Sequence, residues 1–282
     1  MEESSGRKNA SAGILADRDR RVAEARKINL LSNVFMSVAL NDKTACQYVL
    51  RILTGIRDLT VREIRTQYRM AKVQSHDAVL DILAEDACGR LYNLEIQRAD
   101  TIDHARRTRF YGAMIDSEYL EKGKTYAELP DVYVIYVSET DLWRAGYVTY
   151  PVEKYFKNTG VKYEDGQHIL HVNAAVDDGS ETAKLMQYFK TADPDDMTHG
   201  DLSRRIHYLK REEGGFQEMC EVSEKIYREG MEYGRAEGKL ESRKETAQNL
   251  SEMGMSAVDI AKALKVSVEL VREWLADSRN SV

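Results

Sequence analysis

Hydrophobic and polar positions alternate along residues 79–84 and again along residues 90–97. Residues 85–89 between them end in a glycine, which is typical of the turn of a β-hairpin. Because successive side chains of a strand point to opposite faces, each strand has an apolar face and a face that bears a carboxylate. The apolar faces carry Leu80, Ile82 and Ala84 and then Tyr92, Leu94 and Ile96, and the opposite faces carry Val79, Asp81 and Leu83 and then Asn93, Glu95 and Gln97. The pattern predicts a hairpin with one acidic face.

Periodicity also predicts the elements around this hairpin. An apolar stripe at helical spacing predicts a helix that is capped by Asn41 or Asp42, runs to about Leu53 and stops at Gly55. Residues 59–72 are expected to form a strand, although their alternation is irregular, and the apolar run 132–137 is typical of a buried strand. Further helices are expected from Thr101 or Asp103 to about Glu121 and over 181–191 and 201–211, with strands over 146–152 and 168–173.

Changes of composition divide the chain into four parts. Residues 1–22 are polar and are expected to be a flexible leader, and residues 23–213 hold the strands and helices of one α/β domain. Residues 214–250 form a charged helical stretch, which is expected to be a linker. Residues 251–282 close the chain with a small helical tail.

The tail has the pattern of a helix-turn-helix. Ser256 and Ser267 are expected N-caps of its two helices. The expected small core consists of Val258, Ile260, Ala261, Leu264, Val266, Leu270, Val271 and Trp274. A DNA-reading unit of this kind inserts its second helix into the major groove, but here that helix carries more acidic than basic residues. Packing or homo-oligomerisation through the C-terminal helices and DNA binding both stay open.

Composition sets further bounds. No run of the 282 residues reaches the roughly 18 apolar residues of a membrane span. The polar N-terminus lacks an apolar signal core, so we expect a cytoplasmic protein without a membrane partner. The three cysteines, Cys46, Cys88 and Cys220, lie far apart, which argues against a zinc site and against a disulfide framework.

The acidic face of the predicted hairpin is the strongest chemical signal. If the register brings the two strands' polar faces together, Asp81, Glu95 and Gln97 form one cluster of oxygen atoms. Hard cations such as Mg²⁺ are held by one or two carboxylates together with waters and phosphates, so this is a nuclease-like site in outline. The alternative from periodicity alone is that these residues are solvent-facing positions on a half-exposed sheet.

Charge is distributed unevenly along the chain. The net charge is −6, but residues 1–75 carry +6 and the remainder carries −12. A protein that binds phosphates needs a local positive track and not a positive total. Candidates beside the acidic hairpin are Arg98, Arg106, Arg107 and Arg109. The alternative for each of these arginines is a solvated surface charge.

Several segments, taken in order, carry a family resemblance. They are residues 30–40, 80–86, 89–98, 106–111, 129–137 and 191–197. From Leu30 to about Arg211 the chain resembles the PD-(D/E)XK nuclease family transposases, also called the recombination-promoting nucleases. The resemblance implies a restriction-endonuclease-like αβββαβ core with a mixed sheet, and a Mg²⁺-dependent DNA endonuclease, for which Mn²⁺ is a possible substitute, linked to recombination or mobile elements.

The resemblance also assigns roles to residues. Asp81 matches the first acid of the family and Glu95 the second, so both are expected to hold the metal together with the backbone carbonyl of Ile96. Gln97 stands where the wider superfamily has lysine, and it is expected to orient the attacking water. Arg107 or Arg109 is expected to hold the scissile phosphate.

Three positions depart from the pattern of the family or of the wider superfamily. Gln97 stands where the superfamily has lysine, although members of this family often have glutamine there. Asn33 and Val34 stand where members commonly have an aspartate, and Val79 stands where many relatives have arginine. These departures motivate the alternative function of a catalytically impaired nuclease fold that acts as a DNA-binding or interaction module. Action on RNA also stays open.

Overall fold

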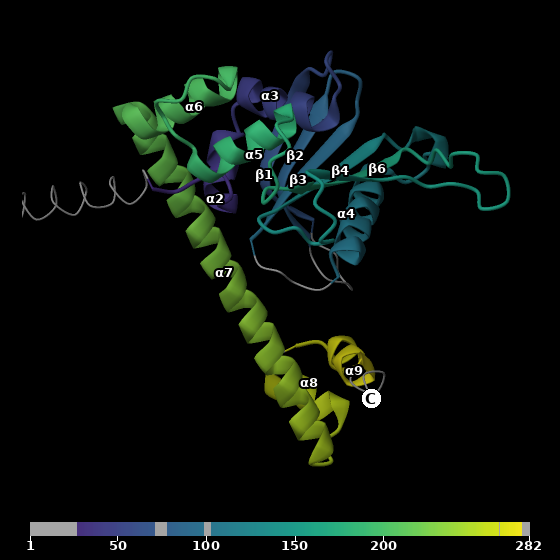
Figure 1. Ribbon diagram of the computed structural model, residues 1–282. Helices are drawn as coiled ribbons and strands as arrows, with labels where there is room; N and C mark the ends of the chain where they lie inside the picture. Colours follow the sequence, from purple (N-terminus) through teal and green to yellow (C-terminus); the bar gives the residue numbers. More distant parts are fainter. Residues whose placement is uncertain (1–26, 71–77, 99–102, 265, 278–282) are drawn as a thin grey trace, which may run out of the picture. The chain divides into compact units, whose positions relative to one another are not determined.

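The computed structural model describes residues 27–70, 78–98, 103–264 and 266–277 (Figure 1). The chain divides into two compact units, of which the first ends at Ser223 and the second begins at Glu224. The expected leader, residues 1–22, lies outside the described residues. Within the described part of the chain, every helix is too short or too polar to cross a membrane.

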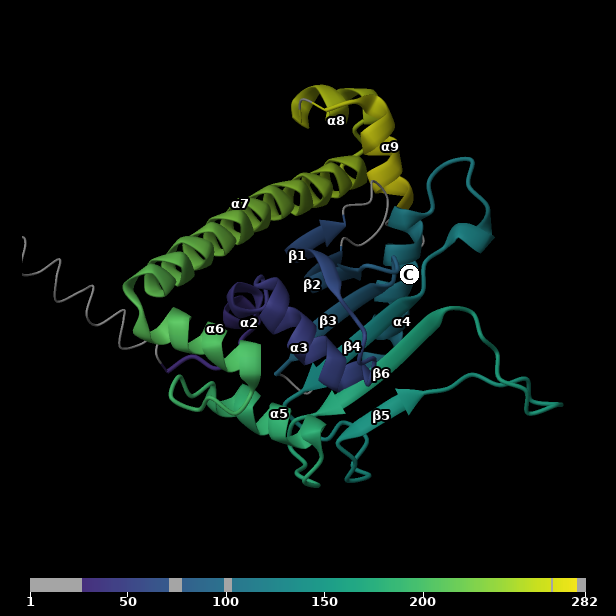
Figure 2. The ribbon, with the colours of Figure 1, turned by 90° about the horizontal axis from the view of Figure 1, so that it is seen from above.

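The first unit is built on a six-stranded mixed sheet. Its strands are β1 (Val61–Met70), β2 (Ala78–Asp86), β3 (Leu91–Gln97), β4 (Val132–Ser138), β5 (Thr149–Val152) and β6 (Gln167–Asn173). They lie in the order β1-β2-β3-β4-β6-β5, which Figure 2 shows from above. β1, β2 and β3 are antiparallel, β3, β4 and β6 are parallel, and β5 returns antiparallel at the edge. The expected α/β fold with a mixed sheet is confirmed.

Helices cover both faces of this sheet. They are α2 (Asn33–Ala39), α3 (Lys43–Thr54), α4 (His104–Tyr119), α5 (Glu181–Thr191) and α6 (Gly200–Arg211), with a short 3₁₀ turn at Tyr126–Glu128. α4 packs on one face, and α2, α3, α5 and α6 pack on the other (Figure 1). β4 is therefore buried on both sides, which explains its continuous apolar sequence.

The ends of α3 follow from its sequence. The Asp42 side chain accepts hydrogen bonds from the backbone N–H groups of Thr44 and Ala45, which have no partner within the helix. At the other end Gly55 adopts a φ of +73°, a left-handed conformation in which glycine avoids the steric cost of a Cβ atom. The predicted start and stop of this helix are confirmed.

β1 and β2 both change faces in the middle. Gln67 has a φ of +49°, and it lies between Thr66, which pairs with Ile82, and Tyr68, which pairs with Leu80. Beyond this point Leu80 packs in the core beneath α4, whereas Ile82 packs in the core on the other side. The prediction that Leu80 and Ile82 share a face is wrong, and the same backbone rotation explains the irregular alternation of β1.

The turn of the hairpin is closed by a buried carboxylate. Asp86 is 1 % exposed. It accepts hydrogen bonds from the backbone N–H groups of Cys88 and Arg90, from the Arg90 guanidinium and from the Tyr92 hydroxyl. Gly89 supplies the positive φ that the turn requires. These bonds fix the register of the strands that carry the acidic residues.

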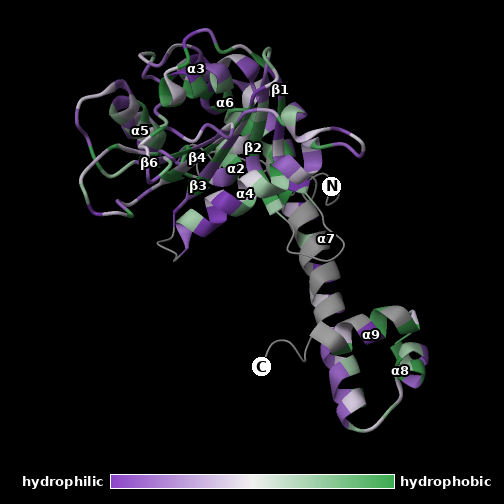
Figure 3. Ribbon diagram, turned by 90° about the vertical axis from the view of Figure 1, so that its right-hand side faces the viewer, coloured by the Kyte–Doolittle hydropathy of each residue, from purple (hydrophilic) through white to green (hydrophobic). Residues whose placement is uncertain are grey.

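The second unit has its own small core. α7 (Glu213–Glu252) continues from the first unit into the second, and α8 (Ala257–Leu264) and α9 (Val268–Asp277) follow it. Ile260, Ala261, Val271 and Trp274 are buried with Ala247 of α7, and Figure 3 shows hydrophobic segments of α8 and α9 in green. The predicted caps are confirmed, since the Ser256 and Ser267 hydroxyls accept hydrogen bonds from backbone N–H groups three residues later.

The expectation that Val258 belongs to this core is wrong. Its side chain is 44 % exposed. Its expected place is taken by Ala247 and the partly buried Leu250, which belong to α7. Helical periodicity within the tail cannot reveal a third helix that supplies part of the core.

Candidate active site

Asp81 and Glu95 lie where the two strands of the hairpin separate. The last backbone pair before them joins Ile82 to Leu94. Beyond this pair, hydrogen bonds to side chains take the place of backbone hydrogen bonds between the strands. Glu95 Oε1 accepts from the Asp81 N–H at 3.1 Å, and Asp81 Oδ2 accepts from the Ile96 N–H at 3.0 Å. Asp81 is 7 % exposed and Glu95 is 4 % exposed. Each carboxylate is thus bound to the backbone of the other strand.

Asn93 of β3 and residues of two further elements, β1 and α2, support the acidic pair. The Asn93 Nδ2 atom donates to Glu95 Oε1 at 2.6 Å. The Gln67 Nε2 atom donates to Asp81 Oδ1 at 3.2 Å and to the Ser37 hydroxyl of α2 at 2.9 Å. Sequence reasoning assigned no role to Ser37, Gln67 or Asn93. Asn93 shares the polar face of its strand with Glu95, whereas Ser37 and Gln67 carry no local signal.

Burial perturbs both acids. The pKa of Asp81 is raised by burial, against the lowering effect of its hydrogen bonds to Ile96 and Gln67 and of the Arg107 charge. The pKa of Glu95 is raised well above its ordinary value, first by burial and then by the charge of Asp81. Two adjacent buried carboxylates that resist ionisation are typical of a catalytic or cation-binding position.

The donor set suits a hard divalent cation. In the described part of the chain, no three His, Cys, Asp or Glu side chains are grouped as a metal site, so Asp81 and Glu95 would supply the protein carboxylates alone. Among those same residues nothing donates to Glu95 Oε2, and the buried Oδ1 atom of Asn93 has no hydrogen-bond partner. Two carboxylates with oxygen-rich surroundings match the way Mg²⁺ is commonly bound.

Arg107 is the cation that α4 directs to this site. Its Nη1 donates to Gln97 Oε1 at 2.7 Å and its Nη2 donates to the Tyr111 hydroxyl at 2.7 Å. The guanidinium also lies over the rings of Tyr111 and Tyr136, at 5.7 and 5.8 Å from their centroids. Its charge lowers the pKa of Asp81 and of Glu95, so Arg107 and Gln97 belong to the same site as the acidic pair.

The other three expected arginines lie differently. Arg98 follows β3 directly and pairs with Glu139 at 3.3 Å. Arg106 is exposed and its guanidinium is 3.5 Å from Asp103. Arg109 is exposed. Of the four arginines, Arg107 is the one that the structure brings to the acidic pair.

Aromatic and histidine side chains extend the site across the sheet. In the strand registers Glu95 pairs with Tyr136, Tyr136 with His171, and His171 with Tyr150. The Tyr136 hydroxyl lies 3.1 Å from Nδ1 of His104, the first residue of α4. Burial and the nearby His104 lower the pKa of His171 to about 4, so this imidazole is neutral near pH 7. His168 stacks on Tyr133 on the other face, as its spacing from His171 predicts.

The positions that depart from the family pattern add no charge here. Asn33 is exposed at the start of α2, where its side chain accepts from the Val34 N–H. Val79 is 39 % exposed and pairs with Arg69 of β1. Gln97 is engaged by Arg107 through its amide oxygen.

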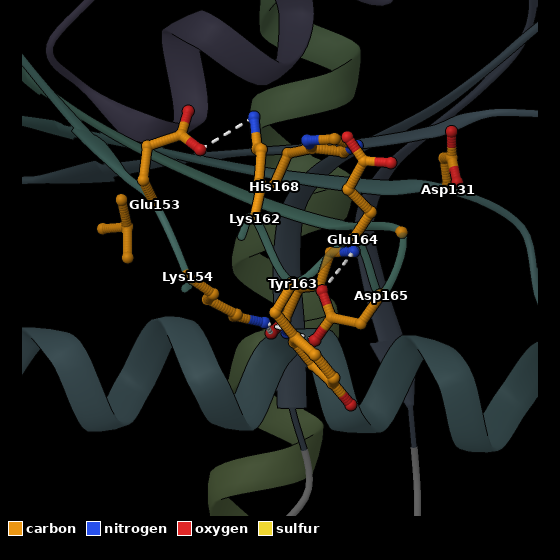
Figure 4. Close-up of a pocket in the computed structure, with 11 residues that line it drawn as sticks. Asp131, Glu153, Lys154, Lys162, Tyr163, Glu164, Asp165 and His168 are labelled. Carbon is orange, nitrogen blue, oxygen red and sulfur yellow. Dashed lines mark hydrogen bonds and ion pairs between the residues drawn. The ribbon is translucent and has the colours of Figure 1, made fainter. Parts of the chain in front are cut away.

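A separate pocket of about 280 Å³ lies at the opposite end of the parallel strands, beside the start of β6. Figure 4 shows its charged lining, in which Lys154 pairs with Asp165 and Lys162 pairs with Glu153. None of the expected site residues lines it. The acidic pair, and not this pocket, is therefore the candidate active site.

The comparison with known families agrees with this geometry. A family model described as PD-(D/E)XK nuclease family transposase matches residues 49–190, half of the chain. The matched range runs from α3 into α5 and includes the whole sheet with Asp81 and Glu95. No curated protein and no solved structure matches the chain.

Proposed function

Because the chain belongs to the PD-(D/E)XK nuclease family transposases, we propose that its first unit is a metal-dependent DNA endonuclease. The observation that carries the proposal is the buried pair of Asp81 and Glu95, whose pKa values are both raised in the metal-free protein. An acidic pair in this condition gains from a bound cation, because burying like charges side by side is otherwise costly. The family links such an activity to DNA recombination or mobile elements.

Asp81 and Glu95 would hold Mg²⁺, or Mn²⁺ in its place, together with the backbone carbonyl of Ile96. Glu95 Oε2 is the oxygen best suited to this, since the Asp81 N–H and the Asn93 amide already occupy Oε1. When bound, a divalent cation supplies Lewis-acid chemistry: it lowers the pKa of a water molecule and offsets charge on the phosphate. Gln67 and Asn93 keep the two carboxylates in place by hydrogen bonds to them.

Arg107 and Gln97 would act on the substrate and the water. A guanidinium presents a fork of N–H donors that fits phosphate oxygens, and Arg107 is held beside the acids by Gln97 and Tyr111. Gln97 is neutral, so it would orient the attacking water by hydrogen bonds and would not take up its proton. In this proposal the proton passes to solvent and not to a lysine.

The test is cleavage of a supercoiled plasmid by the full chain. Nicking is expected with Mg²⁺ or Mn²⁺ and is expected to stop in EDTA. Asp81→Asn and Glu95→Gln keep the size of each side chain but remove its charge, and both are expected to abolish nicking. Glu85→Gln, on the same hairpin with its side chain 24 % exposed, is the matched control and is expected to cut normally.

Calorimetric titration with Mn²⁺ separates this function from the alternative of an impaired nuclease fold that serves as a binding module. The endonuclease is expected to bind the cation at a site that Asp81→Asn removes. Absence of specific binding to the wild-type chain would favour the binding module.

A further inference from the structure

The loop between β4 and β5, residues 139–148, begins at the acidic site. β3 and β4 are parallel and Gln97 pairs with Ser138, so both strands end at the same edge of the sheet. The Glu139 N–H donates to the Gln97 carbonyl at 3.2 Å, and the Glu139 carboxylate pairs with Arg98. The loop is therefore attached to the strand that carries Glu95.

Side-chain hydrogen bonds hold this loop in one shape. The Asp141 carboxylate accepts from the N–H groups of Arg144 and Gly146 at 3.0 and 2.8 Å, and from the Tyr150 hydroxyl at 2.6 Å. The Asn173 side chain of β6 donates to the Tyr147 carbonyl at 3.1 Å. A loop that is held by hydrogen bonds at both ends and in its centre can present side chains at fixed positions.

The ordered loop directs its largest side chains outward. Trp143 is 45 % exposed and Tyr147 is 64 % exposed. The buried side of Trp143 packs on His171, with ring centroids 4.4 Å apart, and approaches His104 at 6.5 Å. His104 begins the helix that carries Arg107, so the tryptophan borders the candidate active site.

In the sequence, Arg144 directly follows Trp143 and precedes Tyr147. It is exposed, and it forms no ion pair with any residue that the structure describes. Its φ of +54° is unusual for a residue with a Cβ atom, and such conformations persist where the surrounding structure enforces them, often at ligand-binding positions. An exposed arginine that forms no ion pair with the described residues, in the same loop as two exposed rings, has the charge to bind a phosphate.

We propose that Trp143, Arg144 and Tyr147 form a subsite for a DNA strand whose bases are unpaired next to the scissile phosphate. The proposal rests on the endonuclease function and narrows its substrate class to DNA with unpaired bases: single strands, duplexes with flaps or gaps, and supercoiled plasmids, in which negative supercoiling opens the duplex locally. The two rings stack on bases and Arg144 binds a phosphate between them. Stacking needs free base faces, which the interior of a duplex does not offer.

Binding is measured in EDTA, so that neither cation binding nor cleavage affects the result. The chain has two tryptophans, and the second, Trp274, is 4 % exposed in the core of the second unit. In a Trp274→Phe background the fluorescence therefore reports on Trp143. A single-stranded oligonucleotide is expected to quench this fluorescence and to protect it from iodide, whereas the blunt duplex of the same sequence is expected to do neither.

Anisotropy of labelled oligonucleotides then measures affinity in variants of the full chain. Trp143→Ala and Tyr147→Ala are each expected to weaken single-strand binding about 5- to 150-fold. Trp143→Phe keeps an aromatic ring and is expected to retain most of the affinity. Arg144→Gln is expected to lower the dependence of log Kd on log salt by about 0.7. Tyr126→Ala removes an aromatic side chain that is 82 % exposed in the 3₁₀ turn before β4, outside the loop, and it serves as the control.

Equal affinity for single strand and duplex, or single-strand binding that survives Trp143→Ala and Tyr147→Ala, would overturn the subsite. A protein that binds single strands through this loop but does not cut plasmid or flapped DNA would refute the endonuclease and leave the subsite standing. A protein that cuts blunt duplexes but does not bind single strands would refute the subsite and leave the endonuclease function standing.

Discussion

Glu95→Gln is expected to stabilise the metal-free protein while it removes the response to cations. The amide keeps an oxygen that can accept from the Asp81 N–H and the Asn93 side chain, so the two hydrogen bonds of Oε1 persist in neutral form. Each such bond loses about 1 kcal/mol when the acceptor is no longer charged. Against this loss, a buried charge beside Asp81 disappears, and the effective penalty for such an ion is several kcal/mol.

The balance predicts a gain in unfolding free energy on the order of 1–3 kcal/mol in EDTA. For a unit of this size each kcal/mol raises the Tm by about 2–4 °C. The wild-type chain is expected to gain about 2.7 kcal/mol at a Mg²⁺ concentration 100 times its Kd, and the variant is expected to gain nothing. Mg²⁺ thus cancels or reverses the order of the two melting temperatures.

The assay is calorimetric or fluorescence melting in EDTA and across a Mg²⁺ series. Glu85→Gln is the control and is expected to change stability by less than about 0.5 kcal/mol in either condition. A lower Tm for Glu95→Gln than for wild type in EDTA would refute the reasoning, because it would mean that the charge of Glu95 stabilises the metal-free fold.

Three further predictions concern the same hairpin. Since burial raises the pKa values of the acidic pair, the folded metal-free state keeps its protons to a higher pH than the unfolded chain, so the stability of wild type relative to Glu95→Gln is expected to fall as pH rises above about 4.5. The Mg²⁺-induced rise in Tm is expected to grow over the same range, and pH-dependent melting checks both slopes. Asp86→Ala leaves the Arg90 charge and the Tyr92 hydroxyl without their acceptor, and urea unfolding is expected to show a loss of about 3–5 kcal/mol. Gln97→Ala removes the acceptor of Arg107 Nη1, so the guanidinium is held less firmly beside the acidic pair. Steady-state cleavage kinetics are expected to show a kcat/KM about 10- to 100-fold lower, with an unchanged Kd for Mn²⁺.

Helix ends and the hairpin could be predicted where they depend on residues close together in the sequence. The Asp42 cap and Gly55 stop of α3 depend on groups within a few residues of each other, and the structure has both. The hairpin likewise follows from alternation and a glycine turn. Asp81 and Glu95 are visible because a carboxylate in an apolar strand is costly unless the fold gives it a partner.

Contacts between distant residues were not predictable in this way. The positive φ of Gln67 reverses the faces of β1 and β2, and no rule for a local strand pattern anticipates a non-glycine residue in that conformation. Ser37 reaches Gln67 from α2, and Ala247 enters the tail core from α7. In each case the partner is set by tertiary packing.

The comparison that tests the central claim most directly is the initial rate of supercoiled-plasmid nicking in Mg²⁺ by wild type, Asp81→Asn and Glu85→Gln. The buried acidic pair predicts that wild type and Glu85→Gln cut at the same rate and that Asp81→Asn falls to the level seen in EDTA. Nicking by Asp81→Asn at the wild-type rate would contradict the assignment of Asp81 and Glu95 as the catalytic site.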